Sequence, residues 1–147
     1  MARAKYIVVI LTIVACALVA TTFAAITINQ NLASSGTIAA GPNVAVFSNS
    51  GCTTALTSIS WGSIEAGGSA TQTIYVENTG GSSMTLSISV GSWSPSTAGT
   101  YITISWTNQG AIVAAGTSVP VVLTLTVSSS VTGITSFSNT ITVSGSG

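Results

Sequence analysis

Alternation of apolar and polar residues with a period of two is the feature that most constrains the fold of this chain. The clearest runs are 84–90 (MTLSISV) and 119–127 (VPVVLTLTV), where apolar side chains alternate mostly with hydroxyl or small ones. This is the pattern of a strand with one buried face. Segments rich in Gly, Asn and Pro separate the runs, and such segments favour chain reversals. The sequence therefore predicts an all-β domain.

Seven strand-like runs follow Gly41, with no helical period and no βαβ spacing between them. They are residues 42–47, 54–61, 69–78, 83–90, 100–107, 117–127 and 134–143. Short strands at this spacing predict an antiparallel β-sandwich of the jelly-roll or immunoglobulin-like kind. Pro120 lies inside one run and has no N–H to donate to a ladder, so we expect that end of the strand at an edge or a bulge.

The first residues have the pattern of an export signal. Arg3 and Lys5 precede the apolar run YIVVILTIVACALVA, and Thr22-Phe23-Ala24 forms a small-x-small cleavage site. We predict a signal peptide over residues 1–24, with cleavage after Ala24 or Ala25. The mature domain is then expected to be secreted and extracellular.

Two other interpretations of this leader stay open. The apolar stretch 6–28 is long enough to be a retained membrane anchor. It also fits the core helix of an archaeal type IV pilin, cut near Ala4 by a prepilin-type peptidase. Each interpretation places the domain outside the cytoplasm, and the signal-peptide interpretation allows membrane contact only through the leader before processing.

A second strand-patterned segment, ITINQNLASSGTI (residues 26–38), joins the leader to the domain. We assign residues 25–41 to an N-terminal arm and residues 42–147 to the sandwich. The arm either folds back as the first strand of its own sandwich or inserts into a neighbouring subunit. Insertion gives a head-to-tail contact that does not close on itself, and such contacts build open filaments. The predicted donor-strand interface consists of the apolar parity of the arm: Ile26, Ile28, Leu32 and Ile38.

Charged residues are almost absent from the chain. Arg3 and Lys5 are the only basic residues, Glu65 and Glu77 the only acidic ones, and there is no His. A domain without Lys or Arg cannot bind nucleic acid through its phosphates, so nucleic acid is excluded as a partner. A neutral, hydroxyl-rich surface also gives little charge repulsion between copies. We expect identical subunits to associate into a homopolymer, a cell-surface filament.

Side chains for catalysis or metal binding are scarce. A glycosidase pair of Glu65 and Glu77 is the one acid–base arrangement available, but both positions adjoin turns, where carboxylates are ordinarily solvated. One thiol and no imidazole cannot form a zinc site. Cys16 lies in the leader, so Cys52 has no intramolecular disulfide partner after processing. We expect Cys52 to be a small buried side chain near a strand end, with an intermolecular disulfide as the alternative. We predict no enzyme activity, no cofactor, and no catalytic or metal residues.

Five aromatic residues form the basis of an alternative function. Trp61, Trp93 and Trp106, with Tyr75 and Tyr101, could make a sugar-stacking platform, as in a cell-surface carbohydrate-binding module. Their positions at strand ends and beside turns favour packing over the ends of a sandwich.

Several phrases also resemble a known family. The order NQNLASSGTI, PNVAVFSNSGCTTALTSISWGSI, GGSATQTIYVENTGG and SWSPSTAGTYITISW is similar to archaeal bundling-pilus pilins, relatives of the TasA/camelysin biofilm matrix fibre proteins. The resemblance covers most of the chain after the leader. It implies a jelly-roll-like sandwich whose N-terminal segment complements the next subunit, in a pilus that bundles cells in a biofilm. Archaeal type IV pilins, which share the Ser/Thr-rich sandwich and the apolar N-terminal segment, are the alternative family.

Overall fold

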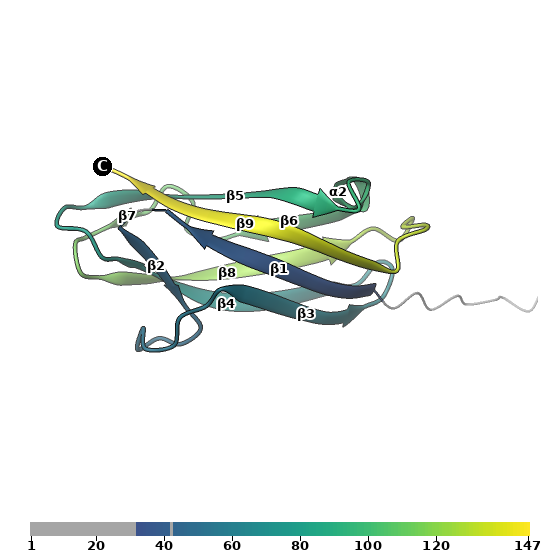
Figure 1. The fold of residues 1–147 in the computed structure, drawn as a ribbon, viewed down its shortest axis with the longest axis horizontal. Helices are drawn as coiled ribbons and strands as arrows, with labels where there is room; N and C mark the ends of the chain where they lie inside the picture. Colours follow the sequence, from purple (N-terminus) through teal and green to yellow (C-terminus); the bar gives the residue numbers. More distant parts are fainter. Residues whose placement is uncertain (1–31, 42) are drawn as a thin grey trace, which may run out of the picture.

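A computed structural model describes residues 32–41 and 43–147 of the protein. This part of the chain forms two packed β-sheets and one short helix (Figure 1). The strands are β1 (Leu32–Ala40), β2 (Val44–Phe47), β3 (Ser58–Ile64), β4 (Ser69–Asn78), β5 (Met84–Ser94), β6 (Ile102–Trp106), β7 (Ile112–Val113), β8 (Ser118–Val127) and β9 (Ser136–Ser146), and the helix is α2 (Ala98–Tyr101).

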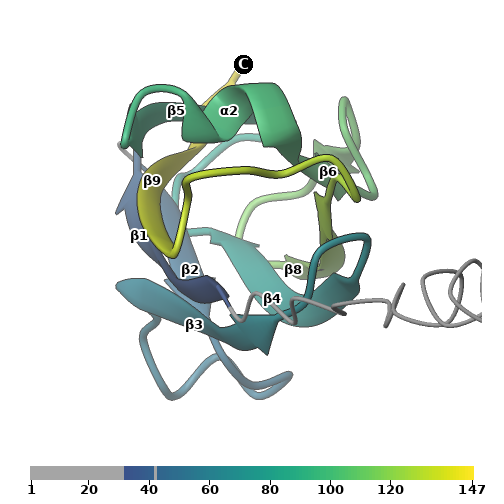
Figure 2. The same ribbon diagram turned by 90° about the vertical axis from the view of Figure 1, so that its right-hand side faces the viewer.

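The two sheets have the strand orders β3-β1-β9-β5-β7 and β2-β4-β8-β6. Viewed from the end of the molecule, the two sheets face each other (Figure 2), and their buried apolar residues form one core cluster. Every strand pair in the described chain is antiparallel except β1 with β9, which run parallel. The predicted all-β sandwich is therefore confirmed. Within the described residues, no helix has the length and apolar character needed to cross a bilayer.

The predicted alternation places the apolar parity of each strand in the core. Leu86 in β5 and Leu123 in β8 have no exposed surface, whereas their neighbours Ser87 and Val122 face solvent. Burying a side chain of this size stabilises the fold by about 1.5 to 3 kcal/mol. The strands thus form because the two-residue alternation of apolar and polar side chains matches a sheet with one buried face and one solvent-exposed face.

Pro120 lies where the sequence predicted. It pairs with Tyr75 of β4, but the ladder between β8 and β6 covers only Leu123 to Val127. At Pro120, β8 therefore pairs only with β4. The side that would face β6 has no ladder there, so the N–H that proline lacks is not needed for a ladder hydrogen bond.

Three local features differ from the predicted runs. The run at 54–61 begins later, because the Asn49 side chain accepts hydrogen bonds from the amides of Thr53 and Thr54 and holds these residues in a loop. The run at 100–107 starts as helix α2. In this helix, Gly99 packs closely against the ring of Trp93: a Cβ at position 99 would lie 2.9 Å from Cδ1 of Trp93. The two-residue strand β7 is too short to give a pattern.

Candidate assembly site

Strand β1, the C-terminal part of the predicted arm, lies between β3 and β9 (Figure 1). Thr37 is opposite Ser58 on the antiparallel side, and Ile38 is level with Ile141 on the parallel side. We call the space between β3 and β9 that residues 32–40 occupy the β1 slot.

The structure brings two of the four predicted interface residues together in this slot. Leu32 is fully buried and Ile38 is 8% exposed, and both contribute to the common core of the sandwich. Ile26 and Ile28 lie outside the described residues. Within one chain, β1 therefore completes its own sandwich, which was one of the two arrangements that the sequence left open.

The middle of β1 contributes little volume to the core. Its two central inward residues are Ser34, whose hydroxyl donates to the Gly62 carbonyl at 3.3 Å, and Gly36. The ladder between β1 and β3 shifts register at this level, so that Trp61 is an extra residue on β3 and Gly62 has a φ of 73°. Such a bulge redirects side chains, and Trp61 is buried here with 5% exposure.

A short crossing segment connects the slot to the rest of the domain. The Gly41 amide donates to the Val143 carbonyl at 2.8 Å, after which the chain passes to the opposite sheet and enters β2. Asn43 has a φ of 63° in this segment, and its carbonyl accepts a hydrogen bond from Thr79 at 3.0 Å. Non-glycine residues adopt this backbone region infrequently. Only three residues thus lie between the end of β1 and the start of β2.

The outer side of the five-stranded sheet carries small hydroxyl side chains. One row across four strands consists of Ser60, Ser35, Ser138 and Ser94, which neighbour one another in the ladders. We call this side the hydroxyl face, with its exposed members Ser35, Thr37, Ser58, Ser60, Thr85, Ser87, Ser89, Ser136, Ser138 and Thr142.

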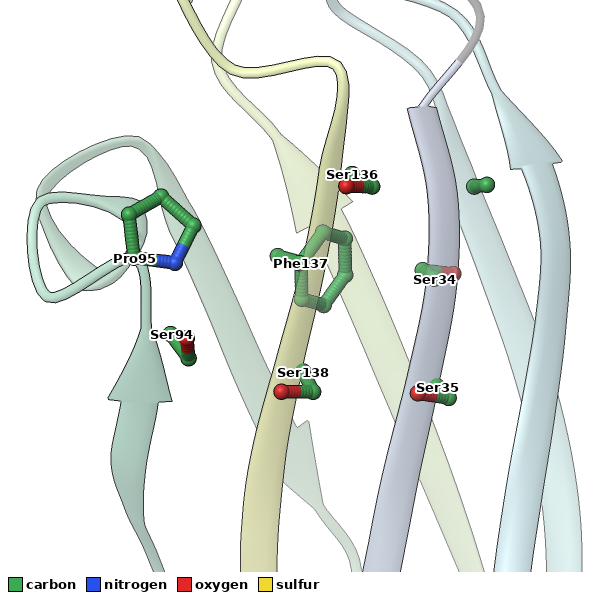
Figure 3. Close-up of a pocket in the computed structure, with 8 residues that line it drawn as sticks. Ser34, Ser35, Ser94, Pro95, Ser136, Phe137 and Ser138 are labelled. Carbon is green, nitrogen blue, oxygen red and sulfur yellow. The ribbon is translucent and has the colours of Figure 1, made fainter.

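A shallow hollow of about 450 Å³ lies on the hydroxyl face where β1 and β9 begin (Figure 3). Serines from three strands surround it, together with Pro95 and the edge of Phe137. None of the described residues that line it is ionisable. A serine needs an adjacent base to become a nucleophile, and these lining residues supply none; their hydroxyls can donate and accept hydrogen bonds.

The two carboxylates do not form an acid–base pair. Glu65 lies in the turn before β4, and Glu77 lies near the other end of that strand. At about 3.3 Å per strand residue they are separated by roughly 25 Å, far beyond the spacing of glycosidase carboxylates. Among the described residues, no cluster of His, Cys, Asp or Glu could hold a metal ion.

The expectation that Cys52 is buried near a strand end was wrong. It is half-buried in the loop between β2 and β3, with a φ of 49°. The Asn49-centred turn holds this loop away from the core.

The aromatic residues do not form one exposed platform. Trp61 is in the core, Trp93 packs on Phe137 with ring centroids 5.8 Å apart, and Trp106 donates to Gln109 at 2.7 Å. Trp93 and Trp106 belong to different sheets. The described chain therefore uses these side chains for packing and hydrogen bonding.

Comparison with known proteins adds no family assignment, since no family model and no curated protein matches the chain. Sequence reasoning missed two residues that shape the slot, Gly36 and Asn139. Both stand on the apolar parity of their runs, and that parity was the available signal. Trp61 was expected to pack over an end of the sandwich; it shares the buried parity of Ile59, and the structure places it in the core beside Gly36.

Substitution of the deepest β1 residue tests how strongly the slot depends on this strand. Leu32→Asp should lower the free energy of unfolding by roughly 3 to 5 kcal/mol, because it buries a carboxylate without a partner. Thr37→Asp, on the exposed parity of the same strand, should change it by about 0.5 kcal/mol or less. Urea unfolding followed by circular dichroism measures both, and equal losses would contradict the assigned faces of β1.

Proposed function

We propose that this protein is the structural subunit of an extracellular filament, a pilus, assembled head to tail by donor-strand complementation. In the filament, β1 of one subunit occupies the β1 slot of the next. The observation that carries the proposal is the position of β1: an N-terminal strand that lies inside its sheet and is connected to the domain only through residues 41–43.

This topology favours exchange because β1 can leave without disturbing any other connection. Its two ladders join it to β3 and β9, and its removal opens a single gap with unpaired backbone groups on both sides. Such a gap is a ready site for a strand from another chain. An identical strand from a neighbour restores the same ladders and the same buried Leu32 and Ile38.

The crossing segment supports exchange over folding back. Short connections held in unfavourable backbone conformations favour domain swapping, since an extended connection relieves them. Asn43, with its positive φ, lies in such a connection. The near absence of charge removes the repulsion that would otherwise keep subunits apart. The resemblance to archaeal bundling-pilus pilins agrees with this function, in cell bundling, adhesion or biofilm.

A cysteine pair across β1 and β3 tests exchange directly. Thr37 and Ser58 are exposed and opposite each other, next to the hydrogen bond from the Ile38 amide to the Thr57 carbonyl. Their Cα atoms should be about 4.5 to 5.5 Å apart, which suits a disulfide. One chain carries Thr37→Cys and another Ser58→Cys, both with Cys16→Ser and Cys52→Ser. After co-assembly and oxidation, we expect disulfide-linked dimers containing one chain of each kind.

The double variant Thr37→Cys/Ser58→Cys in one chain is the control for geometry. If it oxidises within the single chain while the mixture yields no mixed dimers, β1 stays in its own sandwich and the donor-strand proposal is wrong. Each single variant alone should give no dimer through this pair.

The mature N-terminus separates the proposal from its nearest alternative. Donor-strand assembly with a cleaved signal peptide predicts that filament subunits begin at Ala25 or Ile26. N-terminal peptide mapping of purified filaments measures this. A terminus near Ala4 or Lys5 would instead indicate a type IV pilin with a retained N-terminal helix.

Lateral bundling is the second part of the proposal, and we assign it to the hydroxyl face. Each hydroxyl both donates and accepts hydrogen bonds, so this face is complementary to a copy of itself. Both acidic residues of the domain lie off this face, in the turn after β3 and in β4 of the other sheet. Weak contacts of this kind add along two filaments by multivalency.

Two threonines on opposite sheets give a matched test of lateral contact. Thr142→Lys adds a positive charge to the hydroxyl face, and Thr73→Lys adds the same charge to the outer side of the other sheet. We expect the Thr142→Lys filaments to remain single, because like charges would meet, and the Thr73→Lys filaments to bundle like the unsubstituted protein. Negative-stain electron microscopy measures bundle width, and equal bundling of both variants would exclude this face.

A further inference from the structure

Three buried polar atoms gather around Gly36 without a hydrogen-bond partner among the described residues. They are Nε1 of Trp61 and both amide atoms of Asn139. Asn139 is 3% exposed and lies level with Gly36 on β9. The other buried asparagine, Asn78, instead donates to the carbonyls of Ser82 and Val113 and accepts from the Gly80 amide. Burying such groups without a partner destabilises a fold, so their retention calls for a reason.

Space at Gly36 is limited by these two side chains. A Cβ at this position would lie 3.0 Å from Oδ1 of Asn139, 3.5 Å from Nε1 of Trp61 and 3.7 Å from Cδ1 of Ile141. The first distance is tighter than an ordinary contact, and longer side chains would have to displace the indole or the amide. Glycine is therefore the residue that this point of the β1 slot accepts.

The apolar residues of the arm alone would allow the strand to pair in more than one register, and the close contacts at Gly36 distinguish these registers. Ile26, Leu32 and Ile38 are spaced six residues apart. A slip by an even number of residues keeps the same parity inward. A slip of two would bring Gln30 to the place of Leu32, and a slip of four would bring Ser34 to the place of Ile38. Only the slip of six, which brings Ile26 and Leu32 to these places, preserves both apolar contacts.

The two registers differ at two inward places: that of Ser34, where Ile28 would stand after a slip of six, and that of Gly36. After a slip of six, Gln30 would stand there, against Trp61 and Asn139. We propose that Gly36, Trp61 and Asn139 form a register selector, which admits the strand with its glycine at this place and rejects the alternative six residues away. A buried asparagine that fixes register at a cost in stability is known from coiled coils. Gly36 is the only glycine on the inward parity of the arm, because Gly41 lies five residues later and its entry at this place would turn the other face of the strand inward.

The selector acts on whichever strand enters the slot, from the same chain or from another. If the donor-strand proposal holds, it also sets the spacing of subunits in the filament. In the native register residues 41–43 connect the filled slot to the donor's own domain, and the slipped register would add six residues to that connection.

Transplanting the glycine tests the selector in the full-length protein. The variant Gln30→Gly/Gly36→Gln moves the glycine by six residues and leaves the composition unchanged. In the native register a cysteine at 37 is opposite a cysteine at 58, and in the slipped register a cysteine at 31 takes that place. Each arm sequence is therefore combined with Ser58→Cys and either Thr37→Cys or Asn31→Cys, in the Cys16→Ser/Cys52→Ser background.

Mass spectrometry of the oxidised proteins identifies the linked positions. We expect the native arm to link 37 with 58 and the transplanted arm to link 31 with 58. A transplanted arm that still links 37 with 58, or a native arm that links both pairs equally, would overturn the selector. Linkage within or between chains reports separately on donor-strand exchange, so the two proposals can fail independently.

A double-mutant cycle supplies a second test of the selector, which can be carried out even if the transplanted variant does not fold. Gly36→Ala should raise the unfolding equilibrium constant about fivefold or more, but about twofold or less in an Asn139→Ala background, where the amide oxygen no longer meets the new Cβ. Equal changes in both backgrounds would show that Gly36 and Asn139 act separately, and would contradict the selector.

Discussion

The ladders that β1 forms with β3 and β9 are the interaction on which the five-stranded sheet depends. In the strand order β3-β1-β9-β5-β7, β3 joins the sheet only through β1. Without β1, the bulged strand with Trp61 would lose its ladder partner, and β9 would have an open edge beside a core that lacks Leu32 and Ile38. The sandwich therefore requires a strand in this place, whichever chain supplies it.

The strand that meets this requirement stands at the N-terminal end of the domain and pairs in parallel with the last strand. A parallel pair between two such strands needs no direct connection, which distinguishes β1 from strands held in hairpins. In the proposed filament, the same arrangement would let β1 complete a neighbour. Both states would then contain the same ladders, and the balance between them would depend on the backbone conformation of Asn43 and on subunit concentration.

The surface around the β1 slot carries few charged groups that could repel a second subunit. The hydroxyl face offers hydrogen bonds without charge, and the two carboxylates lie at opposite ends of β4. Such a surface relies on solvated hydroxyl groups, with little of the charge that usually protects sheet proteins from association. The proposed filament subunit would not need that protection.

The strict alternation of 84–90 and 119–127 was sufficient to predict the sandwich, because apolar residues at every second position are typical of strands that bury one face of a sheet and fit few other structures. The arm was predicted as a strand that needs a sheet, and Leu32 and Ile38 as its buried residues. The parallel partner of β1 could not be predicted, since β9 lies at the far end of the chain and parallel pairing leaves no local signal. The cluster of Gly36, Trp61 and Asn139 also escaped, because a glycine and an asparagine on an apolar parity resemble interruptions until the bulge at Trp61 brings the three together.

The most direct measurement is a cryo-electron microscopy structure of the assembled filament at a resolution that traces the backbone through residues 40–44. The donor-strand account predicts density for Leu32–Ala40 of one subunit between β3 and β9 of the next, continuous through residues 41–43 with the β2 strand of the donor. Density in which residues 32–40 of every subunit lie in their own sandwich would contradict the account.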